Sequence, residues 1–149
     1  MKNKLYIISH THWDREWYMS FESHRARLVE LMDALIEIME NEPSYKYFHL
    51  DGQTIVIEDY LEIKPFMKPR LDALIKDGRI KVGPWYVLQD ETLISGEANI
   101  RNMLEGYRFC NSGSFRKCRF SGHGWRPGAG HQERRAHPYR AGSFGYPIP

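Results

Sequence analysis

The chain has 149 residues, enough for one domain of ordinary size. Its formal net charge of +2 is the sum of two parts with net charges of opposite sign. Residues 1–112 carry 14 Lys and Arg against 18 Asp and Glu, a net charge of −4, whereas residues 113–149 carry 7 basic residues and one acid, a net charge of +6. The acidic first part argues against nucleic-acid binding, two cysteines are too few for a disulfide framework, and no apolar run is long enough for a signal peptide or membrane span, so we expect a cytoplasmic protein.

The first predicted element is a short buried strand over residues 5–8, and a polar motif over residues 9–17 follows it. Side chains alternate along an extended backbone, so His10, His12 and Asp14 project to one side. Two imidazoles and a carboxylate offer the nitrogen and oxygen ligands that suit zinc. The alternative is a polar turn in which the histidines bond nearby carbonyl groups.

The remaining elements alternate between helix and strand. The apolar spacing and the positions of glycine and proline predict helices over residues 23–40, 54–63, 68–77 and 96–109, and strands over residues 47–50 and 79–82. Strands separated by helices favour right-handed βαβ units and a parallel sheet, so the fold class is α/β.

Helical spacing also predicts which side chains are buried. In the first helix these are Leu28, Leu31, Met32, Leu35, Ile38 and Met39. In the last helix they are Ile100, Met103, Leu104 and Tyr107. Gly78 is predicted to end the third helix as a C-cap.

In parallel α/β folds the functional groups gather at the carboxyl ends of the strands. The three predicted strand ends here supply His12 and Asp14, then Asp51, then Trp85 and Asp90. Either Asp51 or Asp90 could instead be a turn former or a helix cap. A carboxylate close to aromatic rings is typical of a sugar site, because sugar rings stack on flat apolar faces and their hydroxyls need acceptors.

Three ordered motifs, over residues 10–18, 50–53 and 83–90, make the chain resemble the start of glycoside hydrolase family 38. This family comprises α-mannosidases, and its bacterial branch includes mannosylglycerate hydrolases. The resemblance covers residues 1 to about 112. It implies a zinc-dependent retaining glycosidase built on a seven-stranded parallel β/α barrel, acting on α-mannosides or on mannosylated small molecules or oligosaccharides.

The resemblance also implies roles for individual residues. His12 and Asp14 match two zinc ligands, with His10 beside the metal rather than on it. Asp90 matches the residue that is both a zinc ligand and the catalytic nucleophile, and Trp17 matches the aromatic residue that stacks on the mannose ring. Asp51 and Trp85 are added as substrate-binding candidates because of their place at the strand ends.

The resemblance stops near residue 112. Residues 113–149 hold 7 of the 12 glycines, 4 of the 8 prolines and one aliphatic residue larger than alanine, a composition that predicts a disordered tail. The family's acid/base residue and its remaining histidine ligand would lie further along. We therefore expect a truncated barrel in an inactive fragment, with a tail produced by a frame shift or gene break.

Two other functions fit parts of the pattern. His10 and His12 form a His-x-His after a first strand, as in metal-dependent amidohydrolases, although this leaves Asp51, Trp85 and Asp90 unexplained. A non-catalytic remnant that binds zinc or carbohydrate is the second alternative.

Overall fold

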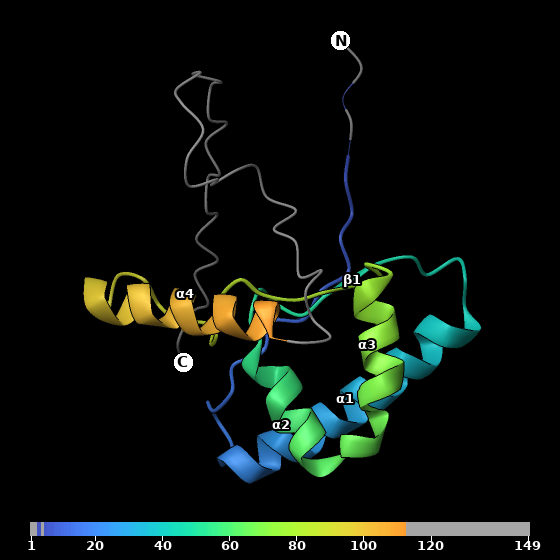
Figure 1. Ribbon diagram of the computed structural model, residues 1–149, viewed down its shortest axis with the longest axis horizontal. Helices are drawn as coiled ribbons and strands as arrows, with labels where there is room; N and C mark the ends of the chain where they lie inside the picture. Colours follow the sequence, from blue (N-terminus) through green and yellow to red (C-terminus); the bar gives the residue numbers. More distant parts are fainter. Residues whose placement is uncertain (1–2, 4, 113–149) are drawn as a thin grey trace, which may run out of the picture.

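The computed structural model describes residue 3 and residues 5–112, where helices alternate with short strands (Figure 1). The elements in chain order are α1 (Phe21–Asn41), β1 (Phe48–His49), α2 (Ile55–Ile63), the 3-10 helix η1 (Pro65–Met67), α3 (Lys68–Lys76), β2 (Ile80–Lys81) and α4 (Gly96–Asn111). The predicted helices are confirmed, with bounds within two residues at each end. The tail predicted over residues 113–149 lies outside the described residues.

The two strands pair in parallel, with Phe48 opposite Ile80 and His49 opposite Lys81. Helices α2 and α3 lie between them in the chain, because a parallel pair needs a long crossover rather than a hairpin. The predicted combination of helices with a parallel sheet is therefore confirmed. Gly78, at a φ of +74°, follows α3 as predicted, in a conformation that glycine adopts without a steric penalty.

The apolar run over residues 5–8 does not form the buried strand that its composition predicts. Its side chains are 66–87% exposed, and Figure 1 shows this segment extending away from the helices. Pairing starts only beyond it, where His49 N donates to Ser9 O (3.0 Å) and Thr11 N donates to His49 O (3.2 Å). A strand is buried only when other elements cover its faces, and the described part of the chain leaves residues 5–8 open to solvent.

The core lies where α1 packs against α2 and α3, as Figure 1 shows. The buried apolar face of α1 consists of Leu28, Met32, Leu35, Ile36 and Met39. The prediction is wrong for Ile38, which is 45% exposed, and Leu31 is only partly buried. Because α2 and α3 both contact α1, its buried stripe includes Ile36 in place of Ile38. Within the described residues, no helix is both long enough and apolar enough to cross a membrane.

The apolar face of α4 is not buried as predicted. Its four apolar side chains are 40–59% exposed: Ile100, Met103, Leu104 and Tyr107. The buried residues of α4 are instead Gly106 and Cys110. Amphipathic spacing shows only that a face is apolar, and the described residues supply no element that covers this one. The helix instead packs against the backbone of residues 84–86 at Gly106.

Candidate functional site

Three loops meet beside the parallel sheet and carry all the predicted site residues. Loop A comprises residues 9–18, loop B residues 50–54 and loop C residues 83–92. Loop A joins the sheet through the parallel bridge between His10 and His49, and loops B and C are joined by a parallel bridge between Gln53 and Trp85. The strand-end rule therefore correctly places the three predicted motifs next to one another.

His12 lies between two carboxylates. Its Nε2 is 3.8 Å from Oδ2 of Asp14, and its Nδ1 is 3.4 Å from Oδ2 of Asp51. The side chains of His12 and Asp14 are 71% and 45% exposed, whereas that of Asp51 is only 15% exposed. Asp51 also accepts a hydrogen bond from the backbone N of Trp13 (2.9 Å), which fixes loop A to loop B. An imidazole and a carboxylate that face solvent together form a donor pair that suits a divalent metal.

Asp90 does not join this cluster. It is exposed, and its Oδ1 accepts hydrogen bonds from the backbone N and the hydroxyl of Thr92, at 3.2 and 2.8 Å. Within residue 3 and residues 5–112, no group of three or more His, Cys, Asp or Glu side chains is placed to hold a metal ion. Zinc therefore fits the pair His12 and Asp14 by its donor chemistry, while the full predicted ligand set with Asp90 stays a prediction.

The predicted aromatic residues differ in their exposure. Trp17 is 76% exposed, which leaves a ring face open to a sugar. Trp85 is half-buried, and its backbone is fixed to loop B, because Trp85 N donates to Gly52 O and Thr54 N donates to Trp85 O, both at 3.0 Å. The substrate-binding roles of Trp17, Trp85 and Asp51 stay predictions.

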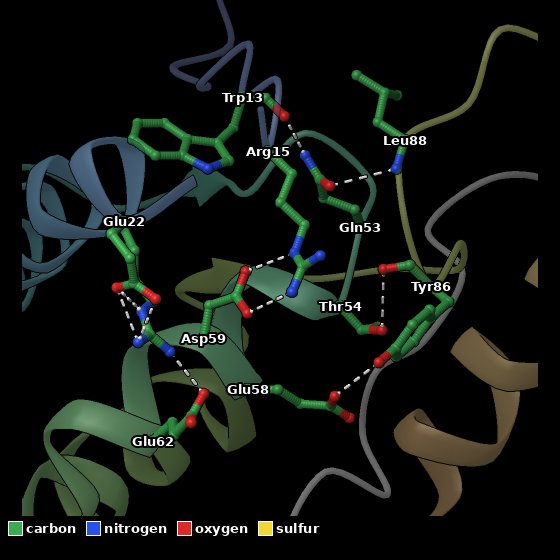
Figure 2. A network of polar contacts seen from close by, with 11 residues as sticks. Trp13, Arg15, Glu22, Gln53, Thr54, Glu58, Asp59, Glu62, Tyr86 and Leu88 are labelled. Carbon is green, nitrogen blue, oxygen red and sulfur yellow. Dashed lines mark hydrogen bonds and ion pairs between the residues drawn. The ribbon is translucent and has the colours of Figure 1, made fainter. Parts of the chain in front are cut away.

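The sequence prediction missed an ion pair that fixes loop A to α2. Arg15 donates from Nε and Nη2 to the two carboxylate oxygens of Asp59, at 2.8 and 3.0 Å (Figure 2). Its guanidinium also lies 4.4 Å from the ring centre of Phe21. Asp59 is 4% exposed. A charged residue on the buried face of α2 is the signal that could have revealed it, since buried carboxylates need partners.

The sequence prediction also missed two side-chain amides that hold loop C, that of the buried Gln53 and that of the half-buried Asn102. The side chain of Gln53 bonds both loop A and loop C (Figure 2). Asn102 of α4 accepts from Val87 N (2.9 Å) and donates to Val87 O (2.8 Å) and to Oε1 of Gln89 (2.7 Å). Loop C is therefore held from two sides, by loop B and by α4.

Tyr86 of loop C should titrate at unusually high pH. Burial, together with the hydrogen bond from its hydroxyl to Oε2 of Glu58 (2.9 Å), raises its pKa from 10 to about 12. The folded chain thus holds this proton more tightly than the unfolded chain does. The contribution to stability is present below pH 10 and is lost as the pH rises toward 12.

We expect Glu58→Gln to move this titration part of the way back toward pH 10, as measured by tyrosinate absorbance against Tyr86→Phe. Glu62→Gln is the matched control, because Glu62 is one turn further along α2 and bonds Arg25 instead. An unchanged high-pH titration in Glu58→Gln would show that the Glu58 contact does not form.

Comparison with known proteins identifies the family to which the chain is similar. The family model described as "Glycosyl hydrolases family 38 N-terminal domain" matches residues 2–141. A Halalkalibacterium halodurans protein, provisionally named a mannosylglycerate hydrolase, is 54% identical over 108 residues, covering 72% of this chain and 12% of that protein. Alpha-mannosidase G of Dictyostelium discoideum is 27% identical over 119 residues, covering 78% of this chain and 11% of that protein.

Solved structures agree with the sequence comparison. The crystal structure of an alpha-mannosidase from Enterococcus faecalis matches with a TM-score of 0.68 and 48% identity, covering 70% of this chain and 12% of that one. A second Enterococcus faecalis structure, of a protein in glycosyl hydrolase family 38, matches with a TM-score of 0.65 and 45% identity, covering 71% of this chain and 12% of that one. The chain thus spans about an eighth of the length of these relatives.

Proposed function

The chain belongs to glycosyl hydrolase family 38, and from this premise we propose that it forms the N-terminal part of the catalytic domain of a zinc-dependent retaining α-mannosidase. The observation that carries the proposal is the meeting of loops A, B and C at one edge of a parallel sheet, with His12 between two carboxylates. Because the chain belongs to this family, we no longer propose the amidohydrolase alternative, which rested only on the His-x-His of loop A.

The proposed substrates are α-mannosides, including mannosylated small molecules and oligosaccharides. The names of the relatives support this class, since they include alpha-mannosidases and a mannosylglycerate hydrolase. Trp17 would stack on the sugar ring, because its indole is largely exposed beside the polar side chains of loop A. Asp51 and Trp85 would line the same edge from loops B and C.

His12 and Asp14 would hold the zinc ion, and Asp90 would supply a further carboxylate from loop C. When bound, zinc would orient sugar hydroxyls and favour the distorted ring of the transition state. His10 would stay off the metal, since its Nδ1 lies against the carbonyl of Thr11.

Asp90 would act as the nucleophile of the retaining reaction. Its carboxylate would attack the anomeric carbon while the bond to the leaving oxygen breaks, and a second carboxyl group would protonate that oxygen. A retaining enzyme places these two groups about 5–5.5 Å apart. The exposure of Asp90 supports this role, because an attacking group must be reachable by substrate.

The proposed architecture is the first part of a seven-stranded β/α barrel. The order of loop A, β1 and β2 supports it, since chain neighbours lie side by side in parallel, as in a barrel. We place the boundary of this part at residue 112, with residues 113–149 as a separate tail, although the family model matches as far as residue 141. A cytoplasmic location stays a prediction from the composition.

We propose further that a polypeptide of these 149 residues does not turn over substrate on its own. It spans about an eighth of the relatives' length, and the family's acid/base residue is expected beyond the matched segment. A non-catalytic protein that binds zinc or mannose thus remains the second candidate for the isolated polypeptide.

Zinc binding tests the proposal on the polypeptide itself. We expect one weakly held zinc ion per chain, and its affinity should fall by tenfold or more in His12→Ala, because an imidazole ligand disappears. The measurement is competition with a chromophoric chelator, checked by metal analysis. His10→Ala is the matched control and should keep its zinc. Equal affinities in His12→Ala and the unchanged chain would show that the ligand assignment is wrong.

A further inference from the structure

Gln53 lies at the junction of loops A, B and C with a fully buried side chain, 0% exposed. We infer that Gln53 is a positioning residue that fixes loop A relative to loop C, and thereby His12 and Asp14 relative to Asp90. The metal-binding and catalytic roles of those three residues rest on the proposed function. The role of Gln53 in positioning the loops does not depend on it.

The two ends of the Gln53 amide bond different loops. Its Nε2 donates to the backbone carbonyl of Trp13 at 2.6 Å, and its Oε1 accepts from the backbone N of Leu88 at 3.2 Å (Figure 2). Trp13 stands between His12 and Asp14 in the sequence, and Leu88 stands two residues before Asp90. One side chain therefore links the backbone beside the proposed metal ligands to the backbone beside the proposed nucleophile.

Residues that follow Gln53 in the sequence also hold loops A and C, each of them one loop. Asp59 holds loop A through Arg15, and Glu58 holds loop C through Tyr86. The backbone N of Thr54 also donates to Tyr86 O at 3.1 Å. Loop B and the first turns of α2 thus form a common base for both loops (Figure 2). Gln53 differs from its neighbours because its own side chain bonds both loops.

The link requires an amide at this position. The carbonyl of Trp13 needs a donor and the N–H of Leu88 needs an acceptor, and a neutral amide supplies both from one planar group. Glutamate keeps the acceptor but loses the donor, and methionine, which has a similar volume, loses both. A residue that only filled space would tolerate methionine better than a buried charge.

The test is NMR of the whole 149-residue chain labelled with fluorotryptophan, combined with amide hydrogen exchange. In Gln53→Met we expect the Trp13 resonance to shift and the Leu88 amide to exchange at least tenfold faster. In Gln53→Glu the Trp13 resonance should shift while the Leu88 amide stays protected. An unchanged Trp13 resonance in Gln53→Met would overturn the inference.

Asn102→Leu is the matched control, because it removes an amide that bonds loop C to α4 without touching loop A. It should leave the Trp13 resonance in place. If neither Gln53 variant folds, exchange in the unchanged chain decides the question. Slow exchange of the Leu88 amide supports the link, and exchange as fast as in an open loop overturns it.

Zinc affinity provides the functional arm of the test. Loss of hydrogen bonds that orient the ligands of a metal commonly lowers metal affinity by about 10–100-fold, and we expect a loss in that range for Gln53→Met. Glu62→Gln is the control for this measurement, because Glu62 bonds Arg25 rather than loop A or loop C, and its zinc affinity should lie within twofold of that of the unchanged chain. If the unchanged chain binds no zinc, the proposed metal function fails, and the Trp13 and Leu88 signals still decide the role of Gln53. Zinc affinity unaltered in Gln53→Met, with both signals moved, would overturn the effect on His12 and Asp14.

Discussion

Gly106→Ala is expected to lower the free energy of unfolding by about 1–3 kcal/mol or more, because there is no room for a side chain at this position. A Cβ atom on Gly106 would lie 2.1 Å from Pro84 O, 2.4 Å from the carbonyl carbon of Trp85 and 2.6 Å from Tyr86 N. These are backbone atoms of loop C, which cannot turn away as the end of a flexible side chain could. Either α4 separates from loop C or loop C moves.

Urea unfolding, followed by circular dichroism, measures this loss. Gly96→Ala is the matched control, because a Cβ there meets nothing within 4 Å and alanine favours a helix over glycine. The control should be neutral or slightly stabilising. If Gly106→Ala is as stable as Gly96→Ala, then α4 does not pack on loop C as described.

Asp90→Asn is expected to remove nearly all turnover from a complete enzyme that contains this site. Such an enzyme is a chimera in which residues 1–112 replace the matched segment of the Enterococcus faecalis alpha-mannosidase, which is 48% identical. Loss of the attacking group should lower kcat/KM by about a thousandfold or more, since a proposed metal ligand disappears with it. Hydrolysis of an aryl α-mannoside gives the rates.

Thr92→Val provides the control for this experiment. It removes the hydroxyl that bonds Asp90 and keeps the carboxylate, so it should leave most of the turnover intact. The alternative is that Asp90 only stabilises the turn before α4. In that case, Asp90→Asn would cost about 1 kcal/mol of stability at most and would leave kcat/KM close to that of the unchanged chimera.

The helices and the parallel order could be predicted because they depend on local patterns. Apolar spacing defines α1, and Gly78 marks the end of α3. The faces of the helices were harder to predict, because burial depends on what lies opposite. Ile38 and the apolar face of α4 are exposed where no described element covers them.

The candidate site divides in the same way. The strand-end rule brought His12, Asp14 and Asp51 together although no strand forms over residues 5–8, because the parallel bridge between His10 and His49 keeps loop A beside the sheet. The bonds of Gln53 could not be predicted, since they join residues 40 and 35 positions apart and leave no periodic trace in the sequence. Asp90 remains on an exposed turn with Thr92, so its role has to be tested chemically.

Covalent trapping in the chimera tests the proposed function most directly. A fluorinated mannosyl donor slows the breakdown of a glycosyl-enzyme intermediate more than its formation, so a retaining enzyme should accumulate a stable adduct. Digestion and mass spectrometry should then place one fluoromannosyl group on the peptide that contains residues 85–91, at Asp90. A label on Asp51 or on any other residue, or no label in a chimera that hydrolyses α-mannosides, would contradict the assignment of Asp90 as the nucleophile.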